Sequence, residues 1–171
     1  MMPMPKPLIG PGATRSQPDR TADACASLRG AVCEGTPVAG TLGITQAELE
    51  ALYVIAHAKY LRADFDGART VFARLVQLSH LDARFLMGLG GCEQMLGRHS
   101  HALLQYVAAG MVRPADPDPM FHSAQCLIAL DAVTQAKEAL VIACARANAP
   151  EHEGVRLRAQ TLLNDLEVKQ S

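Results

Sequence analysis

Three glycines within four residues are the first feature of the sequence that could do chemistry, in the stretch MGLGGCEQMLG that starts at Met87. Closely spaced glycines bind phosphate where Gly-x-Gly-x-x-Gly opens a helix after a strand, or where Gly-Lys-Ser/Thr follows. Here Glu93 stands where the third glycine would be, and no Gly-Lys-Ser/Thr follows. The pattern argues against a phosphate-binding loop, and we interpret the glycines as packing residues that let a neighbouring backbone come close: Gly88, Gly90 and Gly91.

His99 and His101, with His122 and Cys126 further along, raise the question of a zinc site. Ligands two residues apart on a helix point to different faces, so the first pair does not form a site. Cys126 lies 34 residues after Cys92 and is therefore interpreted first as a packing residue. No Ser-His-Asp or Cys-His-Asn arrangement stands out. The sequence predicts no enzyme, no catalytic residue, no metal and no cofactor; the alternative, a metal-dependent enzyme, would contain bound metal.

The composition argues against several classes of partner. The chain has 171 residues, 49% of them hydrophobic and 4% aromatic, with a formal net charge of −1. So small a charge gives no electrostatic footprint for nucleic acid or for an acidic membrane surface. No apolar run is long enough to cross a bilayer, so direct membrane insertion is not expected. Five cysteines, an odd number, and the lack of a secretory signal pattern predict reduced thiols in the cytoplasm.

The N-terminal quarter differs in composition from the rest. Six of the ten prolines fall within the first 37 residues, so we expect residues 1–20 to be a disordered, proline-rich arm. Residues 21–43 are predicted to be an N-terminal helix and its connection. The helix would cover 21–34, where apolar residues recur every four positions, at Ala24, Leu28 and Val32.

A repeat of 34 residues organises the remainder of the chain. Small residues and large apolar residues keep this spacing at four positions: Ala56/Gly90/Ala124, Ala68/Ala102/Ala136, Phe72/Tyr106/Leu140 and Leu75/Ala109/Ala143. A period of 34 with small residues at fixed positions is typical of tetratricopeptide repeats, which are pairs of antiparallel helices. The sequence predicts an all-α tetratricopeptide superhelix at 44–171, with repeats at about 49–82, 83–116 and 117–148 and a capping helix at about 151–169.

Such a stack has a concave surface lined by the first helix of each repeat. The three-residue set Tyr53, His57 and Tyr60 forms one stripe, because its members are four and three residues apart. Leu52, Ile55 and Ala56 are assigned to the core of the same helix, which leaves the stripe facing a groove. We expect the groove to bind an extended apolar peptide containing proline or leucine. Its predicted contact residues are Tyr53, His57, Tyr60, Arg84, Met87, Gln94, Phe121 and Gln125.

Several longer stretches resemble a known family. "LDARFLMGLGGCEQMLGRHSHALLQY", followed by "DPMFHSAQCLIAL", is similar to the class II chaperones of bacterial type III secretion, which guard hydrophobic translocator proteins. "ELEALYVIAHAKYLRADFDGARTVFARLV" resembles the first repeat of that family, and "RLRAQTLLNDL" its final helix. The resemblance covers roughly residues 27–168, and it includes positions beyond the generic repeat: Asp82, Arg84, Phe85, Gly88, Leu89, Gly90, Phe121, His122 and Cys126.

The resemblance implies a cytosolic chaperone without enzymatic activity. Such proteins keep translocators soluble and secretion-competent, and hold a short segment containing proline and leucine in the concave groove. Tyr53 and Tyr60 match positions where the family often has aromatic groove residues, whereas His57 departs from the aromatic sometimes found between them. Many members self-associate through the N-terminal region, so a homodimer is expected. The alternative is a generic tetratricopeptide scaffold that bridges cytosolic partners.

Overall fold

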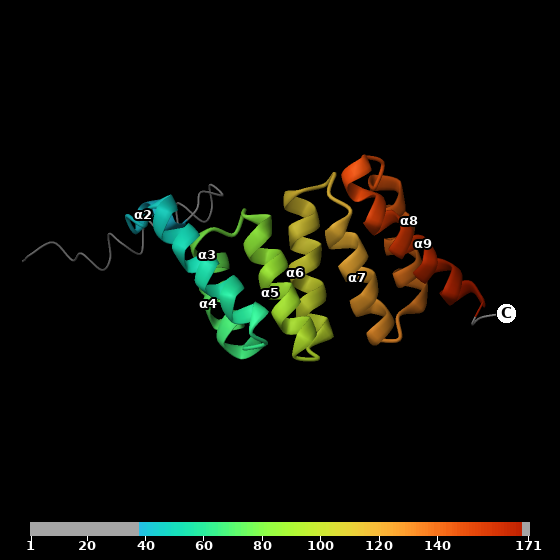
Figure 1. Ribbon diagram of the computed structural model, residues 1–171, viewed down its shortest axis with the longest axis horizontal. Helices are drawn as coiled ribbons and strands as arrows, with labels where there is room; N and C mark the ends of the chain where they lie inside the picture. Colours follow the sequence, from blue (N-terminus) through green and yellow to red (C-terminus); the bar gives the residue numbers. More distant parts are fainter. Residues whose placement is uncertain (1–37, 169–171) are drawn as a thin grey trace, which may run out of the picture.

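The computed structural model describes residues 38–168, which contain helices and turns but no strand. Three antiparallel hairpins follow one another and stack side by side (Figure 1). Their helices are α3 (Gln46–Leu61) with α4 (Phe65–Leu78), α5 (Ala83–Met95) with α6 (His99–Val112), and α7 (Asp118–Ala129) with α8 (Val133–Arg146). This arrangement confirms the predicted all-α tetratricopeptide fold.

Shorter elements flank the hairpins. A one-turn helix, α2 (Val38–Thr41), precedes α3, and a 3-10 turn, η1 (Pro150–His152), leads into α9 (Glu153–Val168). The last helix packs mainly on α8, at the end of the stack opposite α2 (Figure 1). The predicted proline-rich arm and the predicted helix at 21–34 lie outside the described residues.

Local signals in the sequence account for where the helices begin and turn. The Thr45 hydroxyl accepts a hydrogen bond from the backbone N–H of Glu48, whose carboxylate in turn accepts from the backbone N–H of Thr45, which is a complete capping box. Each hairpin turn contains one residue with positive φ, at intervals of 34: Ala63 at 61°, Gly97 at 74° and Asp131 at 60°. The period therefore includes the backbone of the turn.

The 34-residue period is also the packing period of the core. Ala68, Ala102 and Ala136 are all fully buried, and so are the positions of Leu75, Ala109 and Ala143. The large position four residues after each alanine is buried as well, with Phe72 and Tyr106 at 2% exposure and Leu140 at 0%. A tiny side chain at one position and a large one at the next let neighbouring helices interlock, since protein interiors are close-packed.

The glycines of α5 make room for aromatic rings. A Cβ at Gly90 would lie 2.7 Å from the ring of Tyr106, and a Cβ at Gly88 would overlap the ring of Phe72. The nearest neighbours are thus side chains of α4 and α6. We had predicted that a neighbouring backbone approaches these glycines, and that prediction was wrong, because aromatic side chains do so instead. Glycine lowers the intrinsic stability of the helix, but it allows two large rings to be buried beside the helix.

One part of the predicted core of α3 was also wrong. Ile55 is 49% exposed, and Leu52 is half-buried against the core. The buried side of the helix is formed by Leu49 and Ala56, with Tyr53 packed partly against them. The true core side is therefore rotated towards the tyrosine stripe.

Candidate functional site

A groove of about 390 Å³ is lined mainly by α3, α5 and α7, the first helices of the three hairpins. Five of the eight predicted contact residues line it: Tyr53, His57, Tyr60, Arg84 and Met87. They share the groove with Phe72 of α4, Tyr106 of α6, Arg113 and Asp116 of the turn before α7, and His122 of α7 itself. The groove has an aromatic floor and charged groups at its edge, a composition suited to a peptide.

The tyrosine stripe of α3 forms one wall of this groove. Tyr53 stacks on His57 with 6.0 Å between ring centroids, and Tyr60 meets Phe65 edge-on at 5.4 Å. Both tyrosines are half-buried and His57 is exposed. Burial raises the pKa of the Tyr60 hydroxyl, so this group stays a neutral hydrogen-bond donor at physiological pH. Each ring contacts the core with one side and the groove with the other.

Glycine opens the opposite wall. Gly91 lines the groove, and a Cβ there would stand 3.4 Å from the ring of Tyr60. Gly88 likewise lets the buried ring of Phe72 pack against the helix backbone at the groove floor. Met87 lies on the same helix and adds a flexible apolar side chain. The glycine-rich stretch thus helps to shape the hollow.

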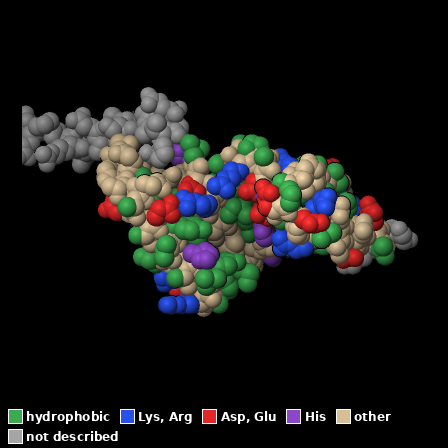
Figure 2. Space-filling model, turned by 45° about the horizontal axis from the view of Figure 1, so that its top comes forward, with side chains coloured by type: hydrophobic (Ala, Val, Ile, Leu, Met, Phe, Trp, Pro, Cys, Tyr) green, Lys and Arg blue, Asp and Glu red, His purple; other side chains and the backbone are tan. Residues whose placement is uncertain are grey.

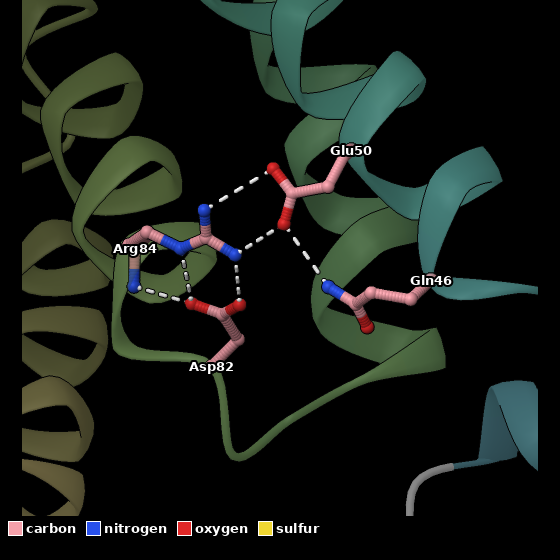
Figure 3. A network of polar contacts seen from close by, with 4 residues as sticks. All are labelled: Gln46, Glu50, Asp82 and Arg84. Atoms are coloured by element: carbon pink, nitrogen blue, oxygen red, sulfur yellow. Dashed lines mark hydrogen bonds and ion pairs between the residues drawn. The ribbon is translucent and has the colours of Figure 1, made fainter.

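Arg84 lies at the edge of the groove, already paired with carboxylates (Figure 3). Its guanidinium donates to Glu50 at 2.6 Å and to Asp82 at 2.7 Å, so it ties α3 to the start of α5. It also lies over the Tyr53 ring, 5.2 Å from the centroid. These hydrogen bonds raise the pKa of Arg84 and hold its guanidinium group in one place. Glu50 in turn accepts a hydrogen bond from Gln46 at 3.0 Å.

A chain of hydrogen bonds joins three helices behind the groove. The Tyr106 hydroxyl donates to Gln94 at 2.8 Å, and the Gln94 amide donates to Gln125 at 3.4 Å. The same Gln125 oxygen lies 3.1 Å from Nδ1 of His122, whose ring stacks on Tyr106 at 5.1 Å. Burial lowers the pKa of His122, so this layer is neutral. Gln94 and Gln125 are engaged with each other and do not line the main groove, contrary to our prediction.

Phe121 is the clearest correction to the predicted contacts. Its side chain is 3% exposed, in the core formed by α7, α8 and α9. The guanidinium of Arg158 covers its ring at 5.0 Å from the centroid. A separate hollow of about 360 Å³ lies here between α7 and α9, and Phe121, Gln125 and Leu157 are among the residues that line it. Helix α9 therefore covers the position on α7 that we had assigned to the groove.

Sequence reasoning overlooked several groove residues. Phe72 and Tyr106 had been assigned to the repeat core, yet both also reach the groove. The signal was present in the glycines, because Gly88 and Gly90 have no side chain and these two rings pack directly against them. Arg113 and Asp116, which lie 4.0 Å apart in the turn before α7, had no signal of this kind.

The described range, 38–168, offers little for other chemistry. It contains no group of three or more His, Cys, Asp and Glu side chains placed to hold a metal ion. Cys126 and Cys92 are fully buried, and burial raises the pKa of each thiol to about 11. In the face shown in Figure 2, acidic and basic side chains alternate in a band rather than forming a patch of one sign. No helix in that range is both long and apolar enough to span a membrane.

No protein-family model matches the chain. Its sequence is 31% identical to the low calcium response locus protein H of Yersinia pseudotuberculosis over 127 residues. These aligned residues make up 74% of this chain and 76% of that protein. This similarity shows the family. The chain belongs to the class II translocator chaperones of type III secretion.

Two solved structures of this family share the fold. PcrH of Pseudomonas aeruginosa, in complex with the chaperone binding region of PopD, superposes with a TM-score of 0.74 at 32% identity, over 75% of this chain and 98% of PcrH. The Yersinia enterocolitica chaperone SycD, in complex with a peptide of the translocator YopD, gives a TM-score of 0.72 at 31% identity, over 75% and 98% of the two chains. Family membership thus rests on sequence and fold together.

Proposed function

We propose that this chaperone holds an extended segment of a hydrophobic translocator, containing proline and leucine, in the groove between α3 and α5. The observation that carries the proposal is the open hollow lined by Tyr53, Tyr60 and Met87, which offers apolar surface with polar tips. PcrH and SycD, which share the fold, have been solved with a region of PopD and a peptide of YopD. The partner class is therefore a translocator, the apolar protein that the chaperone protects before export.

The size of the groove limits what it can achieve alone. Three apolar anchors buried at about 2 kcal/mol each give about 6 kcal/mol, whereas association costs about 4–15 kcal/mol. A short segment in the groove therefore binds weakly, and a stable complex requires further contacts along the translocator. The groove would select the client and align it, while the rest of the surface adds affinity.

The proposal places this action in the bacterial cytosol and includes no catalytic step. The binding residues are Tyr53, His57, Tyr60, Arg84 and Met87, with Arg84 acting through its hold on α3 rather than through a free charge. Homodimerisation through the N-terminal region stays a prediction for this chain, as do the repeat boundaries and the proline-rich arm. A generic scaffold would show the same groove without preference for membrane-inserting clients.

Filling the groove tests the proposal directly. Gly91→Leu places a side chain in the hollow beside Tyr60 without entering the core. Gly154→Leu on α9 is the matched control, because nothing lies within 4 Å of a Cβ there. Each variant is co-expressed with a translocator of the same secretion system, and soluble translocator is quantified.

We expect Gly91→Leu to lower the recovered translocator at least tenfold while the melting temperature stays within a few degrees of that of the control. A variant that folds and still keeps the translocator soluble would refute the groove as the client site. Equal solubilisation of unrelated apolar and polar partners by the unmodified protein would favour the generic scaffold instead.

A further inference from the structure

Helix α3 has a second apolar side, which faces away from the core. Ala51, Val54, Ile55 and Ala58 follow the i, i+3, i+4, i+7 spacing of a single helix face, and we call them the outer stripe. Val54 is 64% exposed and Ile55 49%. A surface helix is normally apolar on one side only, with polar residues opposite. A helix with two apolar sides is normally covered on both.

Later repeats show what covers this side. Thirty-four residues on, the counterparts of Ala51, Ile55 and Ala58 are three residues of α5 that are buried against α4, with exposures of 0%, 8% and 0%: Phe85, Leu89 and Cys92. One repeat further the counterparts in α7 are buried too: Pro119, Ser123 and Cys126. In both cases the second helix of the preceding hairpin provides the cover, since α4 packs on α5 and α6 on α7. Within 38–168 no such helix precedes α3.

We propose that residues 21–34 of the same chain dock on the outer stripe as an antiparallel helix. This segment lies outside the described residues, and its sequence has an apolar residue every four positions, at Ala24, Leu28 and Val32. Fourteen helical residues span about 21 Å and the sixteen of α3 about 24 Å, so the two lengths match. The docked segment would take the place that α4 takes on α5.

The connection favours this occupant over a second copy of the chain. Residues 35–45 contain α2, whose Ala39 is buried in the same core cluster as Leu49 near the start of α3. Only residues 35–45 separate the segment from α3, and so short a tether gives an effective concentration of about a millimolar. A stable dimer interface uses about 20–30 residues a side, whereas the outer stripe consists of four side chains on one helix.

Cross-linking in the full chain tests the docking. The native Cys25 is one residue from Ala24 and belongs to the segment, and antiparallel docking brings it to the C-terminal half of α3. The test variant carries Ala58→Cys in a background of Cys33→Ser and Cys144→Ser. The matched control carries Val141→Cys in the same background, because Val141 is an exposed residue of α8. A short bis-maleimide is added, and the products are resolved by denaturing gel and peptide mass.

The expected product is a link within one chain between Cys25 and position 58, at least tenfold more abundant than any link to position 141. A product of doubled mass through position 58 would overturn the proposal, because a second copy would then cover the stripe. Absence of any link between Cys25 and position 58 would overturn it as well.

A thermodynamic cycle gives an independent readout. Leu28→Asp and Ile55→Glu each introduce a charge into the proposed contact, so each alone should lower the melting temperature by about 5 °C. In the double variant the melting temperature should fall by less than the sum of the two single effects, since the second charge enters a contact that is already broken. Val141→Glu is the surface control and should leave the melting temperature unchanged. Strict additivity of the two effects would contradict docking within one chain.

Discussion

Equivalent positions of the repeat behave differently at the two ends of the stack. Tyr53 on α3 lies in an open groove, half-buried, with His57 and Arg84 around its ring. Phe121 occupies the same position of the repeat 68 residues later, yet it is 3% exposed beneath Arg158 of α9. The repeat sets the direction in which each side chain leaves its helix, while the next element decides whether that side chain is free to meet a client.

The hydrogen bonds follow the same division. At the N-terminal end Arg84 closes an ion-paired network at the edge of the groove and leaves the floor open. In the middle of the stack the amides of Gln94 and Gln125 bond to each other and to Tyr106. Amides satisfied within the chain gain little from a new partner, because exchanging one hydrogen bond for another changes the free energy only slightly. This difference supports our proposal that the client binds to the N-terminal half.

Phe121→Ala should have the largest effect on stability, and it tests this division directly. Removing a buried phenylalanine costs about 3–5 kcal/mol of the free energy of unfolding through the cavity that it leaves. Tyr53→Ala should cost less, because its ring is only half-buried, and should instead weaken client binding about tenfold. Urea unfolding and titration with a translocator peptide measure the two quantities. If both variants lost the same stability and the same binding, the two ends would not differ.

The glycines of α5 provide a second contrast with a smaller effect. Gly90→Ala should lower the free energy of unfolding by about 1–3 kcal/mol, because the new Cβ would lie 2.7 Å from the buried ring of Tyr106. Gly91→Ala faces the groove and should be neutral or stabilising by up to about 1 kcal/mol, since alanine favours the helix. Thermal unfolding of both variants measures the difference. Equal destabilisation would show that glycine is needed for the helix itself rather than for the ring.

Much of the fold could be predicted from the sequence, because one period governs both composition and packing. Ala68, Ala102 and Ala136 had to be small for helices to approach, so their spacing of 34 indicated the hairpins and the stack. Ile55 was assigned to the wrong side of α3, because that helix is apolar on two sides and hydrophobicity alone does not distinguish them.

The groove could be predicted only in part. Tyr53, His57 and Tyr60 were found because their spacing puts them on one stripe of one helix. Phe121 was misplaced because its burial depends on α9, which departs from the 34-residue period and so has no predictable position over α7. Gln94 and Gln125 were misplaced because they are 31 residues apart, and a hydrogen bond between two helices leaves no local pattern in the sequence.

Acid should reveal how much of the N-terminal half depends on Arg84. Burial raises the pKa of Asp82, but the hydrogen bonds from Arg84 outweigh it and hold that pKa below its ordinary value. The Arg84 side chain likewise lowers the pKa of Glu50. A carboxyl group whose pKa is lower in the folded than in the unfolded state stabilises the fold above the unfolded pKa. That contribution is lost as the pH falls through the folded pKa.

The unmodified protein should therefore lose more stability between pH 6 and pH 3 than Arg84→Met does, with urea midpoints as the measurement. At neutral pH the difference should be small, because these ion pairs are partly exposed and screened by solvent. Arg62→Met, in the turn after α3, controls for the loss of one positive charge. Identical acid profiles for all three proteins would mean that the network adds no stability. Arg84 would then contribute to client binding alone, and its substitution should weaken the client complex at neutral pH without changing the stability of the fold.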